Sequence, residues 1–182
     1  MPFEAIYREH FASIWRAVQR FGVSEREAPD ATQEVFVIAF RRLSEFEGRS
    51  SLRTWLFGIA FRVAAARRRH VREQREVLEP PGFDAGSDPA DDPEAAAMRR
   101  ELRALLQLGL NSLPLEQRAV FTMFELEGFS GEEIALALQL PEGTVRSRLR
   151  LARATFSRVV KAALESNQHI RSPRQILEAA HD

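Results

Sequence analysis

The segment that most constrains the fold is a run of prolines, glycines and acidic residues near the middle of the chain. Residues 79–96, EPPGFDAGSDPADDPEAA, contain one aromatic side chain and follow neither a helical nor a strand period. Such a composition cannot bury enough apolar surface to form a core, and it is typical of a linker. The 182 residues of the chain leave room on either side of it for two small globular units.

The blocks on both sides of this segment have helical patterning. Apolar residues recur at spacings of three and four, without an alternating strand run or a hairpin dipeptide between apolar segments. We therefore expect an all-α fold of two small helical domains joined by a flexible acidic linker. The expected boundaries are a first domain at 1–75, the linker at 76–97, a second domain at 98–165 and a C-terminal tail at 166–182.

Three helices are predicted in the first block. The second is expected to begin at Asp30, whose carboxylate can cap the free amides while Gln33 reaches back to the cap. The third is expected to begin near Ser51 and to end in an arginine-rich, solvated segment. The apolar stripes of the first two helices are formed by Phe3, Ile6, Tyr7, Phe11, Ile14 and Val18, and by Val35, Phe36, Ala39, Phe40 and Leu43.

The second block predicts a helix-turn-helix. Ser130 and Glu133 stand at capping-box spacing before a short apolar helix, and the basic segment 142–156, EGTVRSRLRLARATF, follows after a tight turn. Further along, Ser172 and Pro173 can start a short helix that is too short to be stable alone in water.

The basic segment has two distinct faces when it is placed on a helical wheel at 100° per residue. Its apolar side chains fall within about 60° of one another and form the packed face. Its arginines and hydroxyls lie outside that stripe, where a helix docked on residues 134–138 presents them outward. The candidate DNA contacts on this helix are Thr144, Arg146, Ser147, Arg148, Arg150 and Arg153.

Arginine is suited to both parts of DNA recognition. Its guanidinium can bond O6 and N7 of guanine in a fixed fork, which contributes about 1–3 kcal/mol of base discrimination. Further arginines hold phosphates and set the register of the protein on the duplex. The alternative interpretation of the same wheel is an ordinary surface helix with a solvated charged face.

The net charge of zero conceals strong segregation along the chain. Residues 1–75 hold 14 arginines and nine acidic residues, whereas residues 76–97 hold seven acidic residues and no basic one. Residues 98–161 are again basic, with ten basic and seven acidic side chains. Because salt limits the reach of each charge to about 8 Å, these local blocks decide which partners are attracted. Two basic blocks around an acidic linker are compatible with a nucleic-acid partner.

Several classes of protein are disfavoured by the composition. The absence of cysteine excludes disulfides and thiolate metal sites, and the four histidines lack ligand spacing, so we expect no metal and no cofactor. Catalytic constellations and phosphate-binding glycine loops are also missing, which predicts that the protein is not an enzyme. No apolar run reaches about 18 residues, and no charged leader precedes one, so we expect no membrane insertion and a cytoplasmic location.

The sequence resembles a known family, the bacterial RNA polymerase sigma factors of the extracytoplasmic-function (ECF) type. The resemblance covers residues 3–160 in the family's order. Residues 113–156 are similar to its domain that recognises the −35 promoter element, and residues 30–61 to its domain that binds core polymerase and recognises the −10 element. The resemblance implies a protein that directs core RNA polymerase to such promoters and helps to melt them, without catalysis of its own.

The resemblance also assigns a core-polymerase contact. The family pattern D-x-x-Q-E-x-F falls on Asp30, Gln33, Glu34 and Phe36, on a helix that docks on a coiled coil of the polymerase's largest subunit. Polar positions beside the Phe36/Phe40 stripe are compatible with that contact, and the alternative is a solvated helix. The candidate polymerase-binding residues are Asp30, Gln33, Glu34, Val37 and Arg41.

The −10 contacts are assigned in the same way by the motif T-W-L at residues 54–56. In the family, this helix and a neighbouring loop capture a base flipped out of the melted strand, which needs aromatic stacking and arginines on the backbone. The candidates are Trp55, Arg62, Arg67, Arg68 and Arg69. Trp55 and Phe61 can each serve instead as core residues.

Two positions depart from the family pattern. Arg62 stands where an asparagine is common, and this difference bears on base selectivity at the −10 element. Leu151 stands where an arginine is usual in the recognition helix, so Arg150 is the candidate to replace that contact.

Partners and a competing function follow from these assignments. Resemblance implies core RNA polymerase, duplex −35 DNA, the melted −10 strand and an anti-sigma protein as partners. The acidic linker either follows a basic polymerase channel or acts as a spacer. The alternative function is a stand-alone helix-turn-helix regulator that binds a palindrome as a dimer.

Overall fold

A computed structural model describes residues 2–73 and 93–170, with side chains placed for 2–70 and 100–166. These residues form helices and short turns without any strand, which confirms the predicted all-α fold. The helices are α1 (Phe3–Arg20), α2 (Ala28–Arg42), α3 (Leu52–Glu73), α4 (Pro93–Asn111), α5 (Leu115–Phe121), α6 (Gly131–Leu138) and α7 (Glu142–Ile170). A 3-10 turn, η1 (Leu43–Glu45), follows α2, and a π-helical turn, η2 (Thr122–Leu126), continues α5.

The first three helices form a bundle in which α1 packs on both α2 and α3. Ile14, Val18, Val35 and Leu56 are completely buried in its centre. The predicted apolar stripes are only partly core, because the side chains at their edge reach the surface. Phe40 is 64% exposed, so its assignment to the packed face of α2 is wrong.

The start of α2 differs from the prediction. The helix begins at Ala28 with Glu27 as its N-cap, so Asp30 lies exposed in the first turn and is not the capping residue. Pro29 explains the shift, because its fixed φ and missing N–H suit the first helical positions. The hydroxyl of Ser24 donates to the carboxylate of Glu27 at 2.6 Å and braces the new start. Asp30 still favours the helix through its charge near the positive end of the dipole.

The second block contains the expected helix-turn-helix of α6 and α7. The predicted capping box is present: the Ser130 amide donates to Glu133 at 2.9 Å, and the Glu133 amide donates to the Ser130 hydroxyl at 3.1 Å. α6 ends at Gln139, whose left-handed backbone, with a φ of 55°, turns the chain into α7. Val145 and Leu149 of α7 are buried against the same core as Ile134 of α6.

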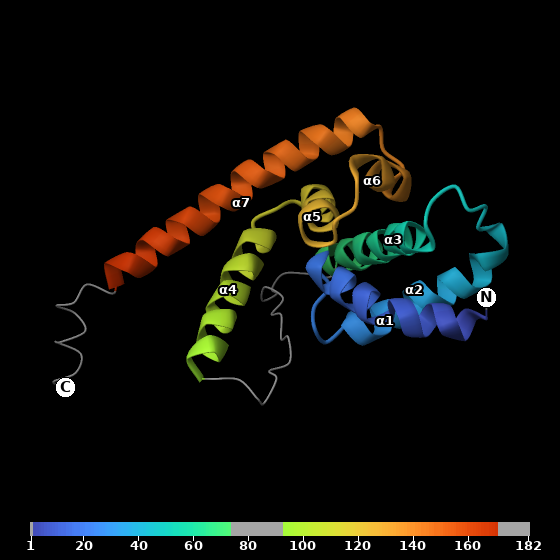
Figure 1. The fold of residues 1–182 in the computed structure, drawn as a ribbon, viewed down its shortest axis with the longest axis horizontal. Coiled ribbons are helices and arrows are strands. Elements are labelled where there is room, and N and C mark those ends of the chain that lie inside the picture. Colours follow the sequence, from blue (N-terminus) through green and yellow to red (C-terminus); the bar gives the residue numbers. More distant parts are fainter. Residues whose placement is uncertain (1, 74–92, 171–182) are drawn as a thin grey trace.

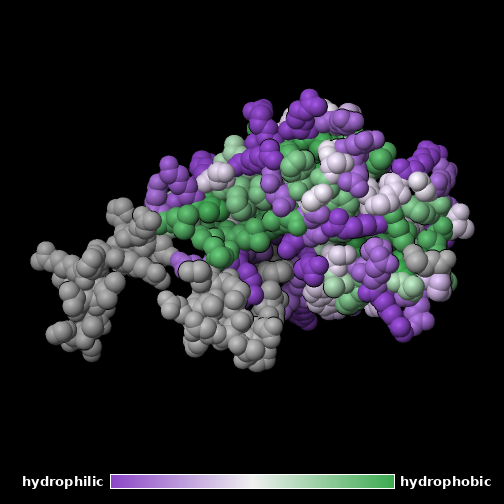
Figure 2. Space-filling view, viewed as in Figure 1, coloured by the Kyte–Doolittle hydropathy of each residue, from purple (hydrophilic) through white to green (hydrophobic). Residues whose placement is uncertain are grey.

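Helix α4 supports the far part of α7. It begins at Pro93, inside the segment predicted as linker, and contacts α7 where Phe156 stacks on Phe121 with ring centroids 4.6 Å apart. Gly109 is required there, because a Cβ would overlap the ring of Phe156. Figure 2 shows an apolar area where α4 and α7 lie on this face, and the exposed leucines of these helices are Leu102, Leu108, Leu151 and Leu164.

Residues 74–75 at the end of the predicted first domain, residues 76–92 of the predicted linker and residues 171–182 of the tail lie outside the described residues. The last of these segments includes the expected helix start at 172–173. None of the described helices is long and apolar enough to span a membrane.

The two helical blocks pack against each other rather than lying apart. Figure 1 shows α3 between the α1/α2 pair on one side and α5 and α6 on the other. Phe57 of α3 contacts Phe129 with ring centroids 4.8 Å apart, and Gly58 lies against the backbone of Ala137 in α6. A single cluster of buried apolar side chains therefore runs from α1 through α3 into α6 and α7.

Candidate nucleic-acid interface

The predicted DNA-contacting side chains of α7 lie on the surface of the molecule. We call the row formed by Arg146 and Arg150 the arginine ridge. Arg146, Ser147 and Arg150 are exposed, while Val145 and Leu149 between them are buried. The local sequence produces this arrangement, because apolar positions four apart dock on α6 and leave the arginine row outside. Among the described residues, Arg146 and Arg150 have no acidic partner, so both guanidiniums are available to phosphates or base edges.

The other predicted contacts of α7 are less free. Thr144 and Arg148 are half-buried, and the carbonyl of Thr144 accepts the hydroxyl of Ser147 at 3.0 Å. Arg153 donates to the carboxylate of Glu125 at 2.6 Å, and its guanidinium lies 5.1 Å from the ring centroid of Phe124. Arg153 therefore ties α7 to η2 through its Nε.

On α3, the predicted −10 residues do not form one cluster. Trp55 is half-buried, with its ring centroid 5.3 Å from that of Phe46, and it lines a polar pocket together with Arg62 and Ser50. Arg62 is exposed, and partial burial of its guanidinium, followed by repulsion from Arg42, lowers its pKa. Trp55 thus has one face in the bundle and one edge available to a ligand.

The arginines farther along α3 have separate environments. Arg67 donates twice to one carboxylate oxygen of Glu34, at 2.7 and 3.1 Å, so a predicted −10 contact is paired with a predicted polymerase contact. Arg68 lies near the carbonyl of Phe21 at 3.4 Å, whereas Arg69 is exposed. The Arg67–Glu34 pair connects α3 to α2, so both residues contribute to the packing of the bundle.

A second surface combines the remaining predicted polymerase contacts with aromatic side chains. Gln33, Val37 and Arg41 are exposed and line a groove between α1 and α2, whereas Asp30 lies outside it, in the first turn of α2. The aromatic lining of the groove consists of Phe3, Tyr7, Phe11, Trp15, Phe36 and Phe40. The sequence analysis placed all of these rings except Trp15 in the apolar stripes and missed the groove, in which Tyr7 and Phe40 are exposed.

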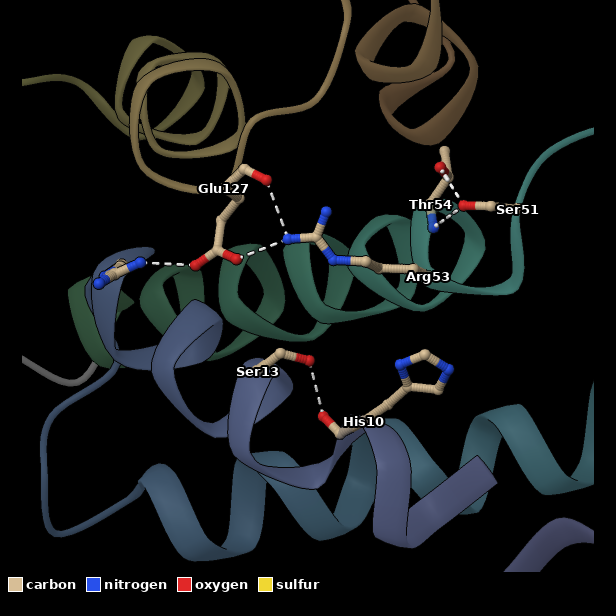
Figure 3. A network of polar contacts seen from close by, with 7 residues as sticks. His10, Ser13, Ser51, Arg53, Thr54 and Glu127 are labelled. Atoms are coloured by element: carbon tan, nitrogen blue, oxygen red, sulfur yellow. Dashed lines mark hydrogen bonds and ion pairs between the residues drawn. The ribbon is translucent and has the colours of Figure 1, made fainter. Parts of the chain in front are cut away.

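Charged residues at the junction of the two blocks were not predicted at all. The carboxylate of Glu127, which is 7% exposed, accepts from Arg20 at 2.5 Å and from Arg53 at 2.8 Å. Figure 3 shows Arg53 of α3 reaching this carboxylate. Arg53 also lies over the ring of Phe129, 4.2 Å from its centroid. The partners come from α1, α3 and the segment before α6, so the network joins both blocks.

Arg118 of α5 makes the deepest of these contacts. Its guanidinium is buried and donates to the carbonyl of Arg20 and to the side chain of Asn111 at 3.0 Å. Burial, and to a smaller extent repulsion from Arg68, lower the pKa of Arg118 to about 9, which leaves it charged at neutral pH. A cation at the carbonyl end of α1 is favoured by the helix dipole.

Two family models match the chain, and each covers one of the helical blocks. The model described as Sigma-70 region 2 matches residues 6–75, and the model described as Sigma-70, region 4 matches residues 103–156. The first match contains α3 and the aromatic groove except for Phe3, and the second contains the helix-turn-helix with its arginine ridge.

Relatives match over nearly the whole chain. The RNA polymerase sigma-H factor of Pseudomonas aeruginosa is 34% identical over 169 residues, which cover 89% of this chain and 88% of that protein. The ECF RNA polymerase sigma-E factor of Escherichia coli K12 is 35% identical over 162 residues, 85% of this chain and 83% of that protein.

Solved structures show the same fold. One is CnrH in complex with the cytosolic domain of CnrY, with a TM-score of 0.64 and 26% identity over 88% of both chains. Another is the sigma factor RpoE in complex with the anti-sigma factor NepR from Bartonella quintana, with a TM-score of 0.68 and 21% identity. That match covers 87% of this chain and 96% of the RpoE chain.

Proposed function

Because the chain belongs to the ECF family of RNA polymerase sigma factors, we propose that it binds core RNA polymerase, directs it to −35/−10 promoters and assists promoter melting. One observation carries this proposal: the chain contains both matched regions, and each has a suitable surface. These surfaces are the α1/α2 groove in region 2 and the exposed arginines of α7 in region 4. A stand-alone regulator is not favoured, because such a protein does not need the region 2 block. The polymerase supplies the catalysis, and the cytoplasm, where transcription takes place, is the proposed location.

For polymerase binding, we propose the α1/α2 groove together with the exposed polar side of α2. The groove offers apolar rings in its floor, and Gln33, Val37 and Arg41 lie at its border. Large exposed apolar patches of this kind mark protein interfaces, and polar groups at the rim add specificity. Asp30 contributes from the first turn, while Glu34 acts mainly through its pair with Arg67.

For the −35 element, we propose major-groove recognition by α7. Arg146 and Arg150 are one helical turn apart, both exposed and without an acidic partner among the described residues. They are placed to contact neighbouring bases or phosphates on one side of the groove. Ser147, Thr144 and Arg148 flank this row and supply phosphate contacts.

For the −10 element, we propose that the edge of Trp55 and the guanidinium of Arg62 receive the extruded base and its backbone. Both line one pocket with Ser50, in the loop before α3. Arg69 is exposed farther along the helix, where it can hold a phosphate. Arg67 and Arg68 contribute to the same basic surface while they anchor α3 to its bundle.

An anti-sigma factor is a further proposed partner. The RpoE protein of similar fold was solved with the anti-sigma factor NepR. By analogy, an inhibitory protein that covers the α1/α2 groove keeps this chain from the polymerase.

In-vitro transcription tests the proposed function. Purified chain and core polymerase are incubated with a genomic DNA library, and the 5′ ends of the transcripts are sequenced. The proposal expects defined start sites that share two upstream motifs and that depend on the chain. Transcription without defined starts, or an unchanged pattern when the chain is omitted, overturns it. A Val37→Glu variant places a charge in the groove and should abolish the starts, whereas Glu9→Gln, on the exposed side of α1, should not.

A further inference from the structure

A polar pocket lies beside α3, where the end of α2, the loop before α3 and the end of α6 meet. Its lining includes Arg42 of α2, Trp55 and Arg62 of α3, and Leu136 and Gln139 at the end of α6. The pocket has a volume of about 400 Å³, and ligand pockets in proteins range from about 300 to 1,000 Å³. It is therefore large enough for a small organic molecule, and the chemistry of its lining indicates which kind.

The charges around this pocket favour an anion. Partial burial, and then repulsion from Arg42, lower the pKa of Arg62, so the two guanidiniums act on each other. The carboxylate of Glu45 already accepts from Nε of Arg42 at 2.9 Å, whereas Arg62 has no acidic partner among the residues that the structure describes. An anionic group between the two arginines relieves their repulsion, and a phosphate accepts several N–H bonds from such side chains.

The same pocket offers two apolar surfaces. Trp55 is half-buried, and Leu136 enters the lining from α6 and is 48% exposed. A flat aromatic group between them covers both side chains, and every nucleobase has an aromatic face that can stack on tryptophan. Arg62 follows Trp55 by two turns on the same side of α3, about 10 Å along the helix axis. A base at Trp55 and a phosphate at Arg62 can therefore belong to one nucleotide.

Gln139 gives a second, independent indication of a ligand. Its backbone is left-handed, with a φ of 55° and a ψ of 50°, a conformation that favours glycine or asparagine at the end of a helix. Its side chain lines the pocket, and its amide has no hydrogen-bond partner within the described part of the chain. Strained residues of this kind concentrate at binding sites. An amide that both donates and accepts is suited to the edge of a base.

We propose that this pocket binds a free nucleoside 5′-phosphate. The base lies between Trp55 and Leu136, with its edge at the amide of Gln139, and the phosphate lies at Arg62 and Arg42. Binding of a free nucleotide needs neither polymerase nor DNA, so the site goes beyond the proposed −10 contact, with which it shares two side chains. A bound nucleotide and an extruded base exclude each other, and only this consequence rests on the proposed function.

Gln139→Gly tests the site without endangering the fold, because glycine suits the left-handed turn better than glutamine does. It removes the amide from the pocket and should not lower the midpoint of thermal unfolding. Arg62→Gln removes the guanidinium that has no acidic partner within the described residues, and Arg158→Gln, at an exposed position of α7, is its matched control. Trp15→Phe leaves Trp55 as the single tryptophan of a chain that has two.

The probes are AMP and GMP, with adenosine as the control without a phosphate and ribose 5-phosphate as the control without a base. Isothermal titration calorimetry measures each affinity, and quenching of Trp55 fluorescence in Trp15→Phe locates the base. We expect AMP or GMP to bind and to quench, and both controls to bind at least about tenfold more weakly. Arg62→Gln should weaken binding about tenfold and Gln139→Gly about fivefold, whereas Arg158→Gln should match the parent.

Three results overturn the proposal. A lack of both heat and quenching with AMP and GMP at millimolar concentrations shows that no nucleotide site exists. Equal affinities for AMP and either control show that the base or the phosphate is not recognised. An unchanged affinity in either Arg62→Gln or Gln139→Gly places the nucleotide outside this pocket. The titrations contain neither polymerase nor DNA, so failure of the proposed function appears separately, as the lack of defined starts in transcription.

Discussion

The junction between the blocks and the outer ridge of α7 use the same side chain in opposite ways. At the junction, Arg20, Arg53 and Arg118 are held by carboxylates, carbonyls and rings that fix each guanidinium. On the ridge, Arg146 and Arg150 are exposed and lack such partners among the described residues. Arginine content alone therefore does not locate a DNA-binding surface. What distinguishes the two regions is whether the protein already supplies the acceptors.

This difference predicts that substitutions at the junction change stability, whereas substitutions on the ridge change DNA binding. We expect the largest effect from Arg118→Leu, because it removes a buried guanidinium and leaves the carbonyl of Arg20 at the end of α1 without that donor. The free energy of unfolding should fall by about 3 kcal/mol, measured by urea denaturation. Arg158→Leu, an exposed position of α7, is the control and should stay within about 0.5 kcal/mol of the parent. A loss below about 1 kcal/mol for Arg118→Leu contradicts its structural role.

A smaller loss is expected from Glu127→Gln, which keeps the shape of the side chain and one oxygen acceptor but removes the charge shared by two arginines. Because Arg53 is 36% exposed, solvent weakens its half of the network, and we expect a loss of about 2 kcal/mol. Glu132→Gln on the exposed side of α6 is the matched control. Equal stabilities of the two variants in urea denaturation show that the network contributes nothing.

The converse test is Arg150→Ala on the ridge. It should leave the free energy of unfolding unchanged within about 0.5 kcal/mol. Binding of the holoenzyme to −35 duplex DNA should weaken about tenfold, and the logarithmic salt slope should fall by about one if the contact is a phosphate. Lys161→Ala, farther along α7, serves as the control. An unchanged affinity of Arg150→Ala for −35 duplex DNA shows that the ridge does not contact DNA. The difference in function between the ridge and the junction would then be contradicted.

The smallest expected effect concerns the capping box at the start of α6. Hydrogen bonds from Ser130, the amide first, lower the pKa of Glu133 below its usual range. The ionised Glu133 carboxylate therefore stabilises the folded state above about pH 4.3, the usual pKa of glutamate. This contribution to the free energy of unfolding is lost as the pH falls through the lowered pKa of the folded state. Thermal unfolding of the parent and Glu133→Gln should differ at pH 6 and converge towards pH 3. A difference that stays constant over this range contradicts the assignment.

The sequence predicts the features that depend on neighbours along the chain. The Ser130/Glu133 box and the buried Val145/Leu149 stripe follow from residues three or four apart, and the structure has both. The start of α2 was predicted wrongly for an equally local reason, since Pro29 fixes an earlier helical turn than the Asp30 cap requires.

Contacts between distant segments were not predictable in the same way. Arg118 meets a carbonyl 98 residues earlier, and Arg53 meets a carboxylate 74 residues later, so no periodic pattern relates the partners. The groove around Phe40 was missed because the sequence does not show how much of an apolar helix face is buried. A face that is only partly covered has the same pattern of apolar residues as one that is fully covered. Only the packing of α1 on α2 shows which edge of each stripe remains exposed.

The most direct test of the account is the distance between the two blocks before and after promoter engagement. Dyes are attached to Ala12→Cys in α1 and Ala154→Cys in α7, two exposed positions in a chain that has no natural cysteine. The energy transfer between them is measured in the free chain, with core polymerase, and with polymerase on a promoter found by start-site mapping. We predict high energy transfer in the free chain, where the two blocks pack together, and low transfer on the promoter, where they contact two separate elements. Equal transfer in the free and promoter-bound states would contradict it.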